Sequence, residues 1–197
     1  MLEAVDDRLL PPADEARRRQ LVRKQDRDDF TAARMVGLLL MGFLHGAPAT
    51  EYEIHQLCDV CGGRHGRPAI PNPSNFDVSW SHDQGVVAAG VGPGRIGVDV
   101  LASARSPRVR DLRSSGLSNP SIETITRAEA LVKVGAGGLA DLIHEAAHRA
   151  APEPTGEVYV SDNNQRVRLQ RMDVDDAIVS VASTHYVRPV FLDNILP

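Results

Sequence analysis

Lysine is nearly absent from this chain of 197 residues, in which only Lys24 and Lys133 stand beside twenty arginines. Arginine is a fixed cation, whereas the pKa of a lysine can be moved by its surroundings. Lysine alone can therefore both bind phosphate and pass a proton near neutral pH. Because arginine would serve wherever bare charge is enough, Lys133 is a candidate functional residue.

The chain also lacks a long apolar run, a strong charge and a cysteine framework. Its longest apolar run, 35–44, is too short to span a bilayer, and its acidic start has no signal pattern, so we expect a cytoplasmic protein with no membrane partner. A net charge of -4 argues against a general nucleic-acid binder. Cys58 and Cys61, the only cysteines, lie too close in sequence to staple the fold.

The remaining composition is that of an ordinary soluble protein, with 42% hydrophobic and 24% charged residues. Residues 15–44 are rich in helix formers, and two apolar runs, 86–91 and 96–101, flank the hairpin-like signal Gly92–Gly94. The segment 102–123 resembles a surface excursion. Each half then combines helix with a few strands. These signals predict an α+β fold divided near residues 92–95, with halves 1–94 and 95–197.

Further elements are expected in the second half. A T-x-x-E capping-box pattern starts a helix at Thr126, and glycines end it after Val134. A second helix is expected over 139–150, followed by strands at 158–161, 167–169 and 178–182.

Glu129 and Lys133 are spaced i, i+4 on the helix from Thr126 and should project from one face. Such a pair is usually a solvated surface ion pair, and Glu129 could equally be the capping-box partner of Thr126. A functional interpretation of the pair therefore needs a second element.

Asp99 supplies a candidate for that element, because a carboxylate inside the apolar run 96–101 is costly unless it is paired or binds a cation. Together with Glu129 it would offer two hard oxygen ligands, the usual protein share of a Mg²⁺ site. The alternative is a turn former at the end of a strand. S-W-S-H at 79–82 and H-G-R-P at 65–68 could add donors for a phosphate.

Read in order, four motifs resemble those of a 4'-phosphopantetheinyl transferase of the larger, pseudodimeric type. They are C-x-x-C-G-G-R-H-G-R-P, S-W-S-H, G-R-I-G-V-D-V and T-R-A-E-A-L-V-K, all within 58–139. The basic segment with Arg27 and Arg34 is similar to the family's amino-terminal region. The resemblance implies two similar α/β halves packed as a pseudodimer within one monomer, with coenzyme A bound between them.

The resemblance also implies a role for each matched residue. Asp99 and Glu129 match Mg²⁺ ligands, and Lys133 matches a lysine near the reacting phosphate. The residues that match coenzyme A contacts are Arg27, Arg34, Arg67, Ser81, His82 and Lys133. The partner would be an apo acyl or peptidyl carrier protein, whose serine attacks the β-phosphate of coenzyme A and releases 3',5'-adenosine bisphosphate. Glu129 or Lys133 could serve the proton transfer, and both assignments stay open.

The chain departs from the family at several positions. Leu101 stands where a third carboxylate is common, Ile125 and Ala128 replace a tryptophan and a lysine of the helix motif, and 102–124 is short. A degenerate member that binds coenzyme A or the carrier without efficient transfer is therefore an alternative.

A different enzyme class is indicated by H-E-A-A-H at 144–148, which fits the zinc metalloprotease pattern H-E-x-x-H on a predicted helix. It has no evident third ligand, so a polar helix face is the competing interpretation. Cys58, Cys61 and His65 could form part of a zinc site but lack a fourth ligand. The arginine-rich segment could bind nucleic acid, but aspartates dilute it and aromatics are few.

Overall fold

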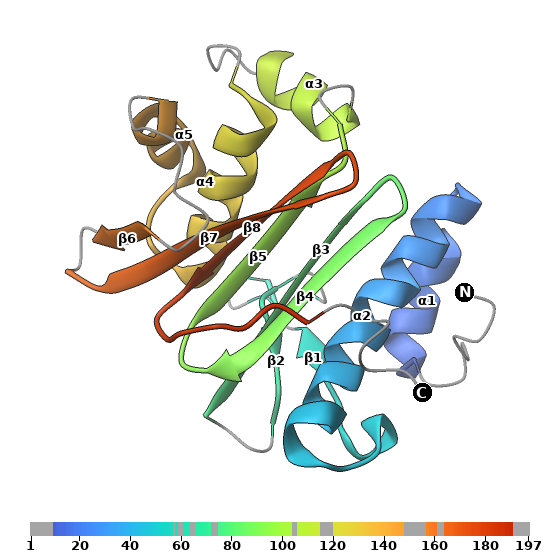
Figure 1. Cartoon of the computed structure of the whole chain (residues 1–197). Coiled ribbons are helices and arrows are strands. Elements are labelled where there is room, and N and C mark those ends of the chain that lie inside the picture. The colour runs from blue at the N-terminus through green and yellow to red at the C-terminus, as the bar shows by residue number, and fades with distance from the viewer. Residues whose placement is uncertain are drawn as a thin grey trace.

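The computed structural model describes residues 10–56, 58, 61–63, 66–71, 75–103, 106–114, 120–147, 157–160 and 164–190. Helices and antiparallel strands are mixed, as expected for an α+β fold (Figure 1). The helices are α1 (Pro12–Gln20), α2 (Lys24–His45), η3 (Ala49–Glu51), α3 (Pro107–Ser114), α4 (Ile122–Val134) and α5 (Leu139–Ala147). The strands are β1 (His55–Gln56), β2 (Pro68–Ala69), β3 (Phe76–Asp83), β4 (Val86–Pro93), β5 (Ile96–Leu101), β6 (Glu157–Val160), β7 (Arg166–Val174) and β8 (Ala177–Ser183).

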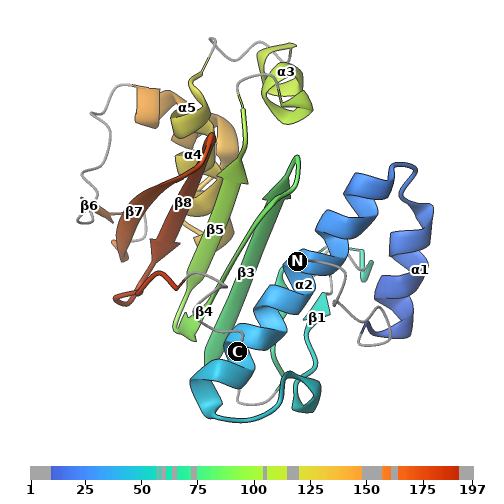
Figure 2. The same cartoon turned by 45° about the vertical axis from the view of Figure 1, so that its right-hand side comes forward.

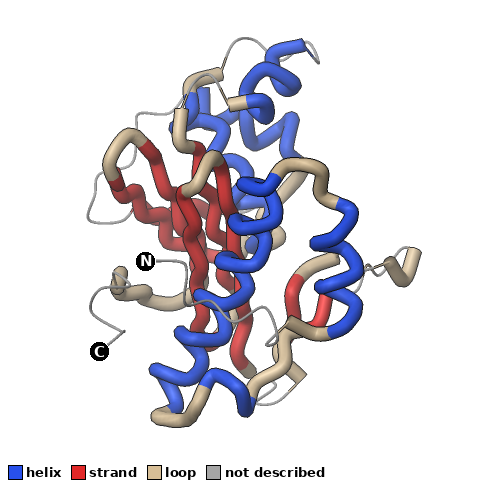
Figure 3. Tube along the Cα trace, turned by 90° about the vertical axis from the view of Figure 1, so that its right-hand side faces the viewer, coloured by secondary structure: helices blue, strands red, loops and turns tan. Residues whose placement is uncertain are grey.

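The strands form two four-stranded sheets, ordered β1-β2-β3-β4 and β5-β8-β7-β6. Helix α2 packs against β3 and β4, and α4 packs against β5 and β8. Figures 1 and 2 show α1 and α2 on one side of the strands and α4 and α5 on the other, and Figure 3 shows the strands gathered between the helices. One sheet ends at Pro93 and the other begins at Ile96, while the division into halves 1–94 and 95–197 and the pseudodimer stay predictions.

The hairpin predicted around Gly92–Gly94 is wrong. Strand β4 pairs with β3 in one sheet, and β5 pairs with β8 in the other. The apolar runs were located correctly. A Gly-Pro-Gly sequence indicates a turn, but it does not indicate whether the strands on either side pair with each other or belong to different sheets. The turn itself needs a glycine at position 94, because its φ is 72°.

Each helix buries one apolar face. On α2, Met35, Leu38 and Met41 recur at helical spacing and pack with Val78 of β3. Helix α4 starts at Ile122 and not at the predicted Thr126, because the Ser121 hydroxyl caps it by accepting from the Thr124 N–H at 3.1 Å. The predicted excursion 102–123 contains α3. None of the described helices is long and apolar enough to cross a membrane.

The two sheets meet along a seam between β3 and β5. There, side chains of β3, and not its backbone, form hydrogen bonds with the backbone of the other sheet. Asp77, Ser79 and Asp83 are spaced by even numbers of residues along β3, so their side chains lie on the same face of the strand. Their oxygens accept the backbone N–H groups of Ile96 at 2.8 Å, Val98 at 2.9 Å and Ala102 at 3.0 Å. This seam, defined by Asp77, Ser79, Ser81 and Asp83 facing β5, explains why one face of β3 carries four polar residues.

Gly97 of β5 allows α4 to approach the sheet closely. A Cβ at this position would lie 2.1 Å from the carbonyl oxygen of Ala130, whereas a Cβ at Gly92 would meet nothing within 4 Å. We expect Gly97→Ala to lower the free energy of unfolding by about 1–3 kcal/mol, as for other overpacked sites. Urea unfolding should show a smaller loss for Gly92→Ala, and equal losses for the two variants would contradict the close contact.

Candidate functional site

A fully buried carboxylate forms the centre of the candidate site. Asp99 lies on β5 with 0% exposure. Its Oδ1 accepts from the Ser81 hydroxyl at 2.8 Å, from Lys133 Nζ at 2.8 Å and from Arg108 Nη2 at 3.0 Å. Its Oδ2 accepts from the same Arg108 nitrogen at 3.1 Å. The buried charge is thus paired and hydrogen-bonded, which is the condition for placing it in an apolar strand.

Lys133 reaches this carboxylate from α4. Its Nζ also donates to the carbonyl oxygens of Val98 at 2.7 Å and Trp80 at 3.4 Å. The Lys133 side chain retains 29% exposure, so its ammonium group connects the buried aspartate with solvent. Of the two interpretations left open for Lys133, the solvated surface pair with Glu129 is not the arrangement found, because Lys133 turns toward β5 and binds Asp99.

Glu129 lies one turn earlier on α4 and faces Arg108 of α3. Its Oε1 lies 3.7 Å from Arg108 Nη2. Burial and the nearby Asp99 charge raise the pKa of the Glu129 carboxyl above its ordinary value, although Arg108 and Lys133 act against this. Burial opposes the charge on Arg108, but Asp99 and Glu129 outweigh it and raise the pKa of its guanidinium.

Ser81 and His82 are adjacent on β3, so their side chains point to opposite faces of the strand. Ser81 joins the Asp99 cluster, whereas His82 lies in the field of Asp29, Arg34, Arg108 and Lys133. Burial lowers the pKa of His82; Asp29 opposes the shift, and the three cations add to it. At neutral pH its imidazole is therefore uncharged and can donate one hydrogen bond and accept another.

The lowered pKa of His82 should be visible by NMR. We expect its imidazole to titrate below the ordinary value of about 6.5, with the resonance identified by its loss in His82→Gln. Since the unfolded chain takes up this proton first, acidification from about pH 6.5 down to the folded-state pKa should destabilise the fold. His82→Gln should lose that part of the pH dependence. A midpoint at or above 6.5 would contradict the buried environment.

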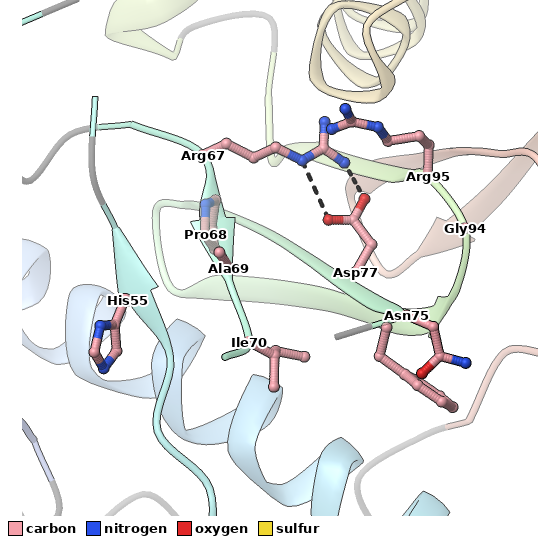
Figure 4. A pocket seen from close by; sticks show the side chains of 10 residues that line it. His55, Arg67, Pro68, Ala69, Ile70, Asn75, Asp77, Gly94 and Arg95 are labelled. Carbon is pink, nitrogen blue, oxygen red and sulfur yellow. Dashed lines mark hydrogen bonds and ion pairs between the residues drawn. The ribbon is translucent and has the colours of Figure 1, made fainter. Parts of the chain in front are cut away.

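Arg67 lies at one end of the seam, where it connects β2 with α4. Its guanidinium pairs with the Asp77 carboxylate and donates to the carbonyl oxygens of Lys133 and of Ile96, the latter at 3.2 Å. Figure 4 shows Arg67 and Asp77 at the wall of a cavity of about 480 Å³ that Arg95 and His55 also line. Asp99, Glu129 and Lys133 do not line this cavity. Arg67 lines it and also binds the Lys133 carbonyl, so it links the cavity to the group of side chains around Asp99.

The two loosely matched arginines of α2 have internal partners. Arg34 is buried, forms an ion pair with Asp14 at 3.2 Å and stacks on the ring of Phe30. Burial lowers the pKa of Arg34 to about 10, while the Asp14 charge limits the shift. Arg27 donates to the carbonyl oxygens of Leu21 and Val22, each at 2.9 Å. Neither guanidinium joins the Asp99 cluster through a described hydrogen bond.

Magnesium, which the resemblance implies, requires oxygen ligands that are free to face it. Both oxygens of Asp99 already accept from cations, and one Arg108 nitrogen stands between Asp99 and Glu129. No group of three or more His, Cys, Asp or Glu side chains in the described part of the chain could hold a metal ion. As arranged, the residues do not fit Mg²⁺, because a guanidinium lies between the two carboxylates. The magnesium prediction stays a prediction.

The other proposed metal motifs lie only in part within the described residues. His144 and Glu145 are on α5, and Glu145 accepts from the Tyr159 hydroxyl at 2.8 Å. His148 lies outside the described residues, as does His65. Cys58 and Cys61 are described, and the Gly62 N–H, next to Cys61, donates to the Cys58 carbonyl at 2.8 Å.

Arg108 is the site residue that sequence reasoning missed. It belongs to a segment rich in serine and arginine, so no local pattern connected it with Asp99. The alternation Asp77, Ser79, Ser81, Asp83 was a usable strand signal, since every second residue is polar and short.

Comparison with models of protein families gave no match, and comparison with curated proteins gave none either.

Proposed function

We propose that this protein transfers the 4'-phosphopantetheine group of coenzyme A to a serine of an apo acyl or peptidyl carrier protein in the cytoplasm. The observation that carries the proposal lies at the junction of the two sheets, where Ser81 and Lys133 bind the buried Asp99 carboxylate directly and Glu129 is joined to it through Arg108. The residues of this group other than Arg108 come from three of the four motifs that carry the resemblance. Arg67, from the fourth motif, touches α4 through the Lys133 carbonyl.

The reaction forms one bond and breaks one bond at the β-phosphorus of coenzyme A. The carrier serine oxygen attacks phosphorus, and the bond from phosphorus to the oxygen of 3',5'-adenosine bisphosphate breaks. The serine proton passes to Glu129, and the leaving bisphosphate takes the electron pair. A carboxylate of raised pKa is the stronger base, which supports Glu129 in this role.

Lys133 fits the role of charge stabiliser better than that of base. Its three described acceptors, Asp99 Oδ1 and the carbonyls of Val98 and Trp80, match the three N–H groups of an ammonium ion. The Trp80 contact is the longest at 3.4 Å, so a phosphate oxygen of the substrate could replace it. The cavity beside Arg67 and Arg95 would receive the adenosine bisphosphate end of coenzyme A, where two guanidinium groups offer charge-assisted hydrogen bonds.

Calorimetric titration with coenzyme A, followed by a turnover assay with apo carrier proteins, tests this proposal. A transferase should bind coenzyme A, be competed by 3',5'-adenosine bisphosphate and release that product only when carrier is present. Binding without release would identify the degenerate relative. If the protein neither binds coenzyme A nor releases the product with any of several carriers, the proposal is overturned.

A further inference from the structure

Arg108 lies between Asp99 and Glu129, the two carboxylates that the resemblance matches to Mg²⁺ ligands. Its Nη2 lies 3.0 and 3.1 Å from the two oxygens of Asp99 and 3.7 Å from Glu129 Oε1. Its Nη1 donates to the Val100 carbonyl at 3.2 Å. Three hydrogen-bond acceptors on β5 therefore hold the guanidinium, and the longer ion pair with Glu129 adds a contact from α4. Charge-assisted hydrogen bonds of this kind to a buried carboxylate are the strong ones.

The segment that carries Arg108 is anchored to the seam on both sides of that residue. The buried Ser106 donates its hydroxyl to Asp83 Oδ1 at 3.0 Å. Val109 is fully buried against Leu101 of β5 and Ile125 of α4. The apolar side chain of Leu101 thus seats α3 and, through it, sets the position of Arg108.

Exposure shows which charge the site presents outward. Asp99 is 0% exposed, whereas the side chains of Arg108 and Lys133 keep 34% and 29% exposure. The two cations therefore cover the Asp99 carboxylate, and a ligand approaching from solvent meets these two positive groups beside Glu129, which keeps 22% exposure. Asp99 is placed as a buried counterion for Arg108 and Lys133.

We propose that Arg108 takes the place of a divalent metal ion, so that Arg108 and Lys133, anchored by Asp99, bind the diphosphate of the substrate without one. This inference rests on the proposed function for the identity of the ligand. The exclusion of metal by Arg108 does not depend on the proposed function. This exclusion depends only on the Asp99 and Glu129 carboxylates and on the Arg108 guanidinium.

Binding of Mn²⁺ alone, followed by its electron paramagnetic resonance signal, tests the inference without substrate. The wild-type protein should leave Mn²⁺ free, whereas Arg108→Gln, which removes the cation between Asp99 and Glu129 and leaves Lys133 paired with Asp99, should bind it at least about tenfold more tightly. Arg108→Lys, which keeps the charge, should behave as wild type. Arg110→Ala on the exposed side of the same helix is the matched control and should also leave Mn²⁺ free.

Three results would overturn the inference. The first is stoichiometric Mn²⁺ binding by the wild-type protein that is lost in Asp99→Asn, a measurement that needs no folded Arg108 variant. The second is equal Mn²⁺ affinity of the wild type and a folded Arg108→Gln. The third is coenzyme A binding by the wild type that requires Mg²⁺ and disappears with a chelator. If coenzyme A does not bind at all, the proposed function fails, and the Mn²⁺ comparison still decides the role of Arg108.

Discussion

Asp99→Ala is expected to lower the free energy of unfolding by about 3 kcal/mol, because removing one partner of a buried ion pair leaves the other charges uncompensated. Asp99 is the common acceptor of Ser81, Arg108 and Lys133, and it is fully buried. The two cations keep part of their exposure, so water relieves some of the loss and the effect stays near the lower end of the range for buried pairs. Urea unfolding measures it.

Asp173→Ala is the matched control for this prediction. Asp173 pairs with Arg171 at 2.7 Å, but its side chain is 64% exposed, and such surface pairs contribute about 0–1 kcal/mol. The account requires Asp99→Ala to be clearly the more destabilising of the two. Equal losses would mean that the Asp99 cluster does not stabilise the fold.

Lys133→Ala is expected to reduce kcat/KM for transfer by about 10²–10³-fold, the usual effect of removing one donor that stabilises charge in a transition state. Its ammonium is partly exposed beside the carboxylate cluster, where a phosphate oxygen can replace its long contact to Trp80. The measurement is product release with saturating carrier, with circular dichroism to show that the variant is folded.

The only other lysine of the chain provides the matched control. Lys24 is 81% exposed at the start of α2, where it pairs with Asp28. Lys24→Ala should leave turnover within about twofold of wild type, since an exposed pair contributes little. A folded Lys133→Ala with the turnover of Lys24→Ala would remove Lys133 from the mechanism.

Sequence patterns predicted most of the regular structure because those elements are set by local periodicity. The apolar runs became β4 and β5, and the glycine after Val134 ends α4 in the left-handed conformation. Strand β3 was missed although its alternation was visible, because its polar face has its partners in the other half of the fold. Asp77, Ser79 and Asp83 accept backbone N–H groups there, and Ser81 donates to the Asp99 carboxylate. Their polarity has no local explanation and becomes clear only with the seam.

The residues of the candidate site were predictable only in part. Asp99 was recognised because a carboxylate in an apolar strand demands a partner, and Lys133 because it is rare. The partner relations were not predictable, since Lys133 binds Asp99 across 34 residues and Arg108 enters from α3, a helix that the sequence patterns did not predict. Leu101, which stands where the resemblance would lead one to expect a carboxylate, packs against Val109 of the helix that carries this arginine.

The intact mass of an apo carrier protein, after incubation with coenzyme A and the wild-type chain, tests the central claim most directly. The account predicts a mass increase of one phosphopantetheine group per carrier, an equal amount of 3',5'-adenosine bisphosphate, and no increase when the acceptor serine of the carrier is replaced by alanine. An unchanged carrier mass with several carriers, together with coenzyme A recovered intact, would contradict it.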